Sequence, residues 1–418
     1  MKYDIKNIKL AEEGRRKINW AAREMGVLAT LETRFKKQKP FLGVRISACL
    51  HVSTETGRLM QVLKAGGAQV VLCASNPLST KDDVAASLVA HDKISVFARH
   101  GASRSQFYRH LTAALDSKPH ITMDDGADLL ALAHTKYRER IPAMYGSTEE
   151  TTTGIIRLRA MEADGALKLP VIAVNDAQTK HLFDNRYGTG QSTLDGIIRA
   201  TNVLLAGKTV VVAGYGWCGK GVAMRARGMG SHVAVTEIDP VRALEAVMDG
   251  FTVVPMKTVA PRADIIITVT GNCEVISAAI IKRLKDGCII ANSGHFDVEI
   301  DVASLKKMAK KSFAGREHVE SYVLPGARTI NLLTEGRLVN LAAAEGHPSS
   351  VMDTSFAGQA LAAEYLVKNY KTLAQGVHGL PDVLDQTIAS LKLSSLRVKH
   401  DILTGRQKNY LNSWGEGT

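Results

Sequence analysis

A glycine-rich turn between two strand-like segments constrains the fold of this chain more than any other feature. Residues 209–213 are strand formers that lead into Gly214-x-Gly216-x-x-Gly219, a helical segment, and a second apolar run ending at Glu237. Gly214 permits a tight turn, Gly216 lets a pyrophosphate approach the backbone, and Gly219 lets the helix pack close to the sheet. The first N–H groups of that helix then face the phosphates. The whole pattern predicts a Rossmann unit that binds a dinucleotide.

The acidic residue that closes the second strand indicates which dinucleotide binds. Glu237 lies 18 residues after Gly219, where its carboxylate accepts hydrogen bonds from the 2′- and 3′-hydroxyls of a ribose. The same negative charge repels a 2′-phosphate. The sequence therefore predicts NAD rather than NADP as the cofactor.

Length and composition set the class of protein. A chain of 418 residues is too long for one ordinary core, so two domains are expected. Its 45% hydrophobic and 22% charged residues are typical of a soluble globular protein. The N-terminal segment has no apolar core of the signal-peptide type and no 18-residue apolar run occurs, so we expect neither secretion nor a membrane span. The five cysteines are odd in number and lack CxxC spacing, which predicts reduced thiols in a cytoplasmic protein.

The net charge of +12 raises the question of a nucleic-acid partner. The basic residues near the start of the chain alternate with glutamates, and aromatic residues make up only 5% of the sequence. Groove-reading motifs and stacking platforms are missing. We interpret the charge as solvated helix faces and a field that attracts anionic small molecules, and expect no nucleic-acid partner.

Strand-like runs alternate with helical segments along most of the chain. After an amphipathic opening helix at about 4–25, the first half has such runs at 43–50, 68–74, 94–98, 120–125 and 169–176. The cofactor half adds runs at 263–270, 287–294 and 328–333. This spacing predicts βαβ units with mostly parallel sheets. The segment after about 350 reads as helical, and 181–190 and 343–352 are candidate hinges.

Polar residues cluster directly after several of these strands, at the edge where open α/β sheets bind ligands. Six clusters stand out: 51–56, 124–130, 146–154, 175–192, 292–301 and 337–353. Each also has a simpler interpretation, since Asp and Asn cap helices, Lys180 could be a surface lysine, and Thr151–Thr153 could begin a helix. We find no metal-ligand spacing, so side chains would perform the acid–base chemistry.

Taken together, the motifs resemble the S-adenosylhomocysteine hydrolase family over almost the whole chain. The strings ETTTG, FDN-x-YG, GYG-x-x-GKG, TEIDP, GHFDVEID, EGRLVN and GHPS appear in the order and at the spacing of that family. The resemblance implies reversible hydrolysis of S-adenosyl-L-homocysteine to adenosine and L-homocysteine. In the implied route NAD oxidises the 3′-hydroxyl, a base removes the C4′ proton, homocysteine leaves, water adds, and the retained hydride reduces the ketone.

The resemblance also implies catalytic roles. Lys180 and Asp184 would lie at the ribose hydroxyls, and desolvation would lower the pKa of Lys180 so that it accepts the 3′-hydroxyl proton. Asp125 and His51 would move protons around C4′ and C5′. His295 would lie near the 3′-carbon and the nicotinamide.

Two further groups of residues would bind substrate and cofactor. The substrate group is Ser53 and Glu55 at the purine, Glu150 with Lys180 and Asp184 at the ribose, and His347 beside the base and homocysteine. The cofactor group is Thr151, Thr152, Thr153, Asn185, Gly214, Gly216, Gly219, Lys220, Gly221, Glu237, Arg242, Thr270, Ser293, Gly294, His295, Asn340 and His347.

The implied architecture has two Rossmann-like domains with parallel sheets, a substrate cleft between them, and a helical C-terminal segment. Residues 1–182 plus 347–380 would form the substrate-binding domain, 190–345 the NAD-binding domain, and 381–418 a C-terminal tail. The family implies a cytoplasmic homotetramer. The sequence ends in QKNYLNSWGEGT without the terminal lysine and tyrosine motif of longer members, so looser NAD binding is expected.

Three alternative functions are considered. Ser53 in place of threonine and Glu345 in place of methionine leave open a hydrolase of the inosyl thioether. A 2-hydroxyacid dehydrogenase shares the two-lobed architecture, but it does not explain GSTEETTTG or FDNRYG. A non-catalytic NAD- or adenosine-binding homologue would show damage at the catalytic positions, which are intact.

Overall fold

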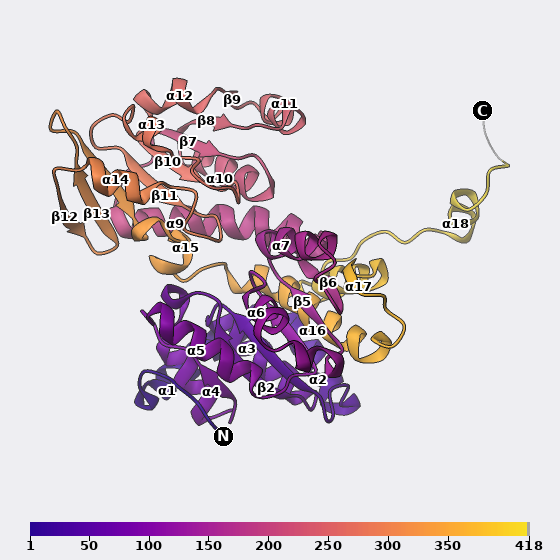
Figure 1. Cartoon of the computed structure of the whole chain (residues 1–418). Helices are drawn as coiled ribbons and strands as arrows, with labels where there is room; N and C mark the ends of the chain where they lie inside the picture. Colours follow the sequence, from indigo (N-terminus) through magenta and orange to yellow (C-terminus); the bar gives the residue numbers. More distant parts are fainter. Residues whose placement is uncertain (416–418) are drawn as a thin grey trace.

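The apolar runs of the sequence become the strands of two separate sheets, each at the centre of one lobe (Figure 1). The computed structural model describes residues 1–415. In both lobes helices cover the two faces of the sheet, as expected where strands are buried on both sides. No helix among these residues is both long and apolar enough to span a bilayer.

The first lobe contains a seven-stranded, entirely parallel sheet in the order β15-β6-β5-β4-β1-β2-β3. Its strands are β1 (Arg45–Leu50), β2 (Gln69–Ala74), β3 (Ser95–Phe97), β4 (Ile121–Asp124), β5 (Gly146–Glu149), β6 (Pro170–Ala173) and β15 (Gly376–Gly379). Alternate side chains of β1 enter different cores, since Ile46, Ala48 and Leu50 pack on one face and Cys49 on the other.

Helices from distant parts of the chain cover this sheet. One face packs against α1 (Ala11–Ala22), α2 (Gly26–Gln38), α3 (Thr54–Ala65), α4 (Asp82–Ala90) and α16 (Ser349–Asn369). The other face packs against α5 (Arg104–Leu115), α6 (Asp128–Lys136) and α7 (Thr152–Ala163). The segment 381–418 begins with α17 (Asp382–Ser395), which packs against α2 and α16. A short helix, α18 (Gly405–Leu411), lies apart from both lobes (Figure 1).

The second lobe contains an eight-stranded sheet in the order β12-β13-β14-β11-β10-β7-β8-β9. Its strands are β7 (Thr209–Ala213), β8 (His232–Thr236), β9 (Thr252–Val253), β10 (Ile265–Thr268), β11 (Ile289–Asn292), β12 (Lys311–Arg316), β13 (Val319–Val323) and β14 (Thr329–Leu333). The sheet is mixed, which corrects the prediction of two parallel sheets. Strand β13 pairs antiparallel with both β12 and β14, because the turns at 317–318 and 324–328 each fold the chain back on itself.

Helices also pack on both faces of the second sheet. One apolar core includes α9 (Thr189–Thr201), α10 (Trp217–Gly228) and α11 (Pro240–Met248). The opposite core includes α12 (Met256–Val259), α13 (Ala278–Ile281) and α14 (Val302–Met308). The short helix α15 (Val339–Ala342) packs against α9 and adds Val339 to the first core.

The chain crosses between the lobes at the two predicted hinges. The first crossing is helical: α8 (Gln178–Lys180) continues through a π-helix, η5 (His181–Gly188), into α9. The second crossing follows α15 and enters α16 at residue 349. Single π-helical segments often occur at functional sites, and both crossings here carry predicted site residues.

The start of the chain differs from the predicted opening helix at about 4–25. Asp4 is extended and forms a β-bridge with Phe97 at the edge of the first sheet, and the helix begins only at residue 11. The backbone N–H of Asp4 donates to the carbonyl of Val96 at 2.9 Å, and its carbonyl accepts from Ala98 at 3.0 Å. Pairing with an exposed sheet edge therefore replaces the first turns of helix.

Candidate functional site

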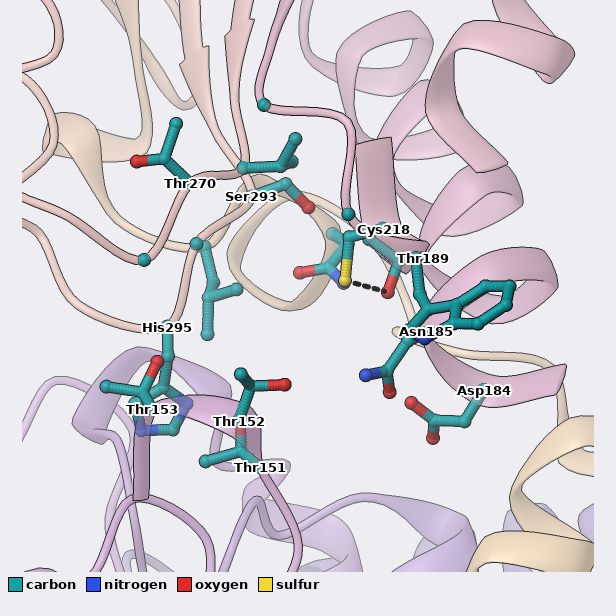
Figure 2. Close-up of a pocket in the computed structure, with 18 of the residues that line it drawn as sticks. Thr151, Thr152, Thr153, Asp184, Asn185, Thr189, Cys218, Thr270, Ser293 and His295 are labelled. Carbon is teal, nitrogen blue, oxygen red and sulfur yellow. Dashed lines mark hydrogen bonds between the residues drawn. The ribbon is translucent and has the colours of Figure 1, made fainter. Parts of the chain in front are cut away.

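A cavity of about 1050 Å³ lies between the lobes and receives the carboxyl ends of strands from both sheets. Nearly all of the residues predicted from the sequence line it: His51, Ser53, Glu55, Asp125, Glu150, Thr151, Thr152, Thr153, Lys180, Asp184, Asn185, Gly214, Gly216, Glu237, Arg242, Thr270, Ser293, Gly294, His295, Asn340 and His347. Gly219, Lys220 and Gly221 lie in α10, outside the cavity wall. Figure 2 shows Thr270 and Ser293 of the second lobe across the space from Thr151 and Thr152 of the first.

The glycine loop has the conformation that its sequence predicts. Gly214 has a φ of +102°, which side-chain-bearing residues rarely adopt, and Gly216 caps the N-terminus of α10. A Cβ on Gly216 would meet only Arg242 Nη1, at 3.9 Å, so the surface above it is open to a phosphate group. A Cβ on Gly219 would collide with the Gly214 carbonyl. The loop therefore fits a pyrophosphate at a helix N-terminus.

The residues after Gly219 have packing roles in the described structure. Lys220 Nζ pairs with Glu245 at 2.6 Å and lies over the Trp217 ring. A Cβ on Gly221 would collide with the Arg186 carbonyl of η5, so this glycine lets α10 contact the first crossing.

The predicted ribose-binding acid, Glu237, lies at the end of β8. Its Oε2 accepts the Tyr215 N–H at 2.6 Å, and its Oε1 accepts the N–H groups of Ile238 and Asp239 at 2.6 and 3.0 Å. A carboxylate offers about four lone-pair positions, so an acceptor position remains for a ribose hydroxyl. Glu237 thus fits the adenosine side of NAD and is fixed by the backbone around it.

A buried charge cluster forms where the first crossing meets the first sheet. Lys180 Nζ lies 2.8 Å from Asp184 Oδ1, 2.8 Å from Asn185 Oδ1 and 3.7 Å from Glu150 Oε1. Burial lowers the pKa of Lys180, but the negative charges of Asp184 and Glu150 outweigh this effect and hold it above its ordinary value. This corrects the expectation of a lowered pKa, because the carboxylates are nearer than sequence alone could indicate. Lys180 is an ammonium group in this state.

The two carboxyl groups beside Lys180 are shifted in opposite directions. Burial raises the pKa of Asp184, yet Lys180 and His347 together hold it below its usual range. Burial raises the pKa of Glu150 to about 7, against the opposing charge of Lys180. Glu150 also accepts hydrogen bonds from Ser355 and, at 2.5 Å, from Gln359 Nε2. One carboxylate therefore stays ionised while the other titrates near neutrality, a pattern common in acid–base sites.

His51, Asp125 and His295 form a second cluster that lines the same cavity. His51 Nε2 lies 3.4 Å from Asp125 Oδ2, and His295 Nδ1 lies 3.6 Å from Asp125 Oδ1. Burial lowers the pKa of His51 to about 4, so its imidazole is neutral at pH 7. Ser79 Oγ lies 2.6 Å from His51 Nδ1 and fixes the ring orientation. One ring nitrogen of each histidine and one carboxylate oxygen of Asp125 all lie within 4.8 Å of one another. The spacing of these residues in the sequence does not reveal this proximity.

The remaining substrate-side residues line the cavity where α3 and the second crossing meet. Ser53 caps α3 by accepting the Thr56 N–H at 3.3 Å, and Glu55 Oε1 accepts the Ser349 hydroxyl at 2.6 Å. His347 Nδ1 lies 3.3 Å from Asp184 Oδ2. The second crossing is therefore tied to both α3 and the Lys180 cluster.

The cofactor-side polar residues are held from within the second lobe. Thr270 donates both its N–H and its hydroxyl to Glu299 Oε2, and Ser293 Oγ lies 2.6 Å from Thr193 Oγ1. Asn340 Nδ2 donates to Ser192 at 3.2 Å, while its buried Oδ1 has no hydrogen-bond partner among residues 1–415. An unpaired buried acceptor facing a cofactor cavity fits a donor from a ligand such as a carboxamide N–H₂.

Several lining or supporting residues were not predicted. Trp217 and Cys218 line the cavity beside the glycine loop, and Cys218 Sγ lies 3.7 Å from Thr189 Oγ1 (Figure 2). Ser355 and Gln359 support Glu150 from α16. The available signal was their i, i+4 spacing, which places the two polar side chains on the same face of the helix.

Comparisons with known proteins agree with this geometry. The family model described as "S-adenosyl-L-homocysteine hydrolase, NAD binding domain" matches residues 185–346, and the model "S-adenosyl-L-homocysteine hydrolase" matches residues 2–140. The chain is 60% identical over 418 residues to the adenosylhomocysteinase of Thermosynechococcus vestitus, covering 100% of this chain and 97% of the relative. The adenosylhomocysteinase of Aquifex aeolicus is 57% identical and that of Saccharolobus solfataricus 54%, each with 100% of both chains covered.

Proposed function

The chain belongs to the S-adenosyl-L-homocysteine hydrolase family, and from this premise we propose how its own residues carry out the reaction. The enzyme reversibly hydrolyses S-adenosyl-L-homocysteine to adenosine and L-homocysteine, with NAD as cofactor, as part of the methyl cycle. The inosyl-thioether and non-catalytic alternatives are not favoured, because full-length relatives at this identity are named adenosylhomocysteinase. The proposed roles of the residues rest on one observation: the Lys180 cluster and the glycine loop line the same cavity.

NAD would be held by the open glycine loop, Glu237 and the polar residues around Thr270 and Asn340. When bound, it takes and returns a hydride at the 3′-carbon of the substrate. Arg242 adds a positive charge near Gly216.

Lys180 and Asp184 hold the ribose hydroxyls and move the proton at the 3′-oxygen. Lys180 begins as an ammonium between two carboxyl groups, so it must give up one of its own protons before it can accept the proton of the 3′-hydroxyl. Glu150 provides for this change, because its pKa of about 7 lets it take up a proton near neutral pH. A neutral Glu150 favours the unprotonated amine of Lys180.

Asp125 and His51 act on the other side of the ribose. His51 is a neutral imidazole at pH 7, so it can accept a proton, and Asp125 lies between it and His295. We assign Asp125 and His51 to proton transfer at C4′ and at the atoms near the departing sulfur. His295 and Thr153 both line the cavity, His295 from the cofactor lobe and Thr153 from the first lobe (Figure 2).

The test of these roles uses purified protein with S-adenosyl-L-homocysteine and a thiol trap, first without added NAD and then with it. We expect thiol and adenosine to be released together. Asp125→Asn and Lys180→Ala should each retain no more than about a few per cent of wild-type turnover, because each removes a proton-transfer group. Greater turnover in either variant would reject the role of that residue. Wild-type protein that releases no thiol even with NAD would reject the function itself.

The arrangement of domains and subunits is also a proposal. We propose a substrate-binding domain of residues 1–182 plus 347–380, an NAD domain of 190–345, and a tail of 381–418.

A homotetramer is supported by Val241, Leu244 and Met248, which are exposed on α11. A cytoplasmic location is supported by the five free cysteines. Light scattering should give a mass of about four chains, and a monomer mass would reject the tetramer.

A further inference from the structure

Glu149 is a buried carboxyl group directly beneath the site that the reaction scheme above does not use. It is the last residue of β5, and its side chain is completely buried. Neighbouring residues Asp125 and Glu150 both line the cavity, but Glu149 does not. Its contacts therefore concern the frame of the site rather than the ligand.

One oxygen of Glu149 joins the two loops that carry the cavity's carboxyl groups. Oε1 accepts the N–H of Gly126 at 2.8 Å and the N–H of Thr151 at 3.0 Å. Gly126 directly follows Asp125, and Thr151 directly follows Glu150. A single acceptor atom thus sets the separation between the loop after β4 and the loop after β5.

The packing around this acceptor leaves little room for adjustment. A Cβ on Gly154 would collide with the Glu149 carboxyl group, so α7 packs directly on it. A Cβ on Gly126, whose φ is +109°, would lie 2.5 Å from His295 Nε2. Gly126 therefore lies between the Glu149 carboxyl, which accepts its N–H, and His295 of the second lobe. The loop that carries Gly126 has no space to shift.

The charges around the second oxygen favour the neutral form of the carboxyl group. Oε2 is buried and has no hydrogen-bond partner among residues 1–415. The charged groups around the Glu149 carboxyl are mostly negative, because Asp124 and Asp125 lie nearby. The guanidinium of Arg157 donates to the Gly126 carbonyl and to Asp128, and not to Glu149. An ionised carboxylate would have no cation to offset its burial. Burial, followed by the charges of Asp124 and Asp125, raises the pKa of Glu149 well above its usual range.

We propose that Glu149 is a positioning residue for the hydrolase reaction: as a neutral carboxylic acid, it holds the Asp125 and Glu150 loops in register through its carbonyl oxygen. The inference rests on the proposed roles of Asp125 and Glu150. Neutrality matters because a third negative charge here would repel both of those carboxylates. A displacement of about 1 Å between catalytic groups costs on the order of 100-fold in rate. The two hydrogen bonds to Glu149 therefore affect turnover although Glu149 does not contact the substrate.

The test compares two variants of the full-length holoenzyme. Glu149→Gln keeps the carbonyl acceptor and the neutral state, so turnover should stay within about threefold of wild type, with an unchanged pH profile. Glu149→Leu removes the acceptor and leaves two buried N–H groups unpaired, so kcat should fall about 100-fold. The matched control is Glu364→Leu, which removes a buried carboxyl of the same lobe whose partners are Arg34 and Lys368. It should lower the melting temperature without lowering kcat.

An infrared difference spectrum of wild type minus Glu149→Gln supplies a readout independent of activity. We expect the carbonyl stretch of a protonated carboxyl group at pH 7. A carboxylate band, a shifted pH profile in Glu149→Gln, or wild-type turnover in a folded Glu149→Leu would each overturn the proposal. If Glu149→Leu does not fold, the Gln variant and the spectrum still decide. Wild-type protein without thiol release would instead reject the proposed function, and the infrared band would remain testable.

Discussion

Glu150 serves the reaction but lowers the free energy of unfolding above its ordinary pKa. Its pKa is about 7 in the folded protein, against an ordinary value of 4.5. Between these two values the folded state binds more protons than the unfolded state, so stability falls as pH rises through this window. At pH 8 the buried charge costs up to roughly 3 kcal/mol, with the favourable charge of Lys180 already included in the pKa.

Glu150→Gln should remove this cost. The variant's free energy of unfolding, relative to wild type, should rise by roughly 1–3 kcal/mol between about pH 5 and about pH 8. Denaturant unfolding at both pH values measures the difference, and thiol release should show that substrate turnover is lost. An equal difference at the two pH values would mean that Glu150 does not titrate in this window. Glu335→Gln, an exposed counterpart, should show no such pH dependence.

The sequence predicts which residues gather in the site better than it predicts their ionisation. Asp125, Glu150 and Glu237 all follow strands, and parallel strands end at a common edge. The raised pKa of Lys180 depends on Asp184, four residues along the chain, and on Glu150, which follows a distant strand. The raised pKa of Glu150 depends on its burial, and its hydrogen-bond partners Ser355 and Gln359 lie about two hundred residues away in the chain. Such distances are fixed only by tertiary packing.

At the scale of elements, α17 holds the turn that presents Lys180. Asp385 on α17 accepts the N–H groups of Gln178 and Thr179 at 2.8 and 3.0 Å, and also the Thr179 hydroxyl. These N–H groups begin α8, so Asp385 caps that short helix from outside its own sequence. The position of the Lys180 side chain thus depends on a helix that follows the last strand of the sheet.

Asp385→Ala should reduce kcat about 10- to 100-fold, because the freed turn lets Lys180 shift. The unfolding free energy should also fall by about 1–3 kcal/mol, since the buried N–H of Thr179 and the partly buried N–H of Gln178 lose their acceptor. Stopped thiol-release assays at saturating substrate, with NAD content measured on the same samples, check the result. The control is Asp382→Ala on the exposed first turn of α17, which should leave kcat unchanged. An unchanged kcat in a destabilised Asp385→Ala protein would make Asp385 purely structural.

Apolar strands were predictable as elements, and polar strands were not. The runs at 68–74 and 120–125 correspond to β2 and β4 within a residue or so at each end. Strand β5 was missed because GSTE is polar although completely buried, its hydroxyls being paired inside the lobe. The β12–β13 hairpin was missed because all six residues of β12 are exposed, which leaves no hydrophobic pattern to detect.

At the scale of the whole molecule, the two crossings are parts of the site. Lys180, Asp184 and Asn185 lie on the first crossing or its start, and Glu345 and His347 on the second. Lys81 of the first lobe also donates to the Ala344 carbonyl at 3.1 Å, which ties the second crossing to α4. Rotation of the lobes would move catalytic groups directly, so cofactor binding and lobe arrangement are linked.

Because both lobes line the cavity, NAD should stabilise both of them. At about 100 times its Kd, a ligand that binds only the folded state adds about 2.7 kcal/mol. We expect NAD added to stripped protein to raise the melting temperature of every calorimetric transition, including that of the first lobe. NADP at equal concentration should raise it less, because Glu237 repels a 2′-phosphate. In Glu237→Gln the two shifts should converge. Equal shifts in wild type would reject the NAD preference, and an unmoved first-lobe transition would reject the coupling between lobes.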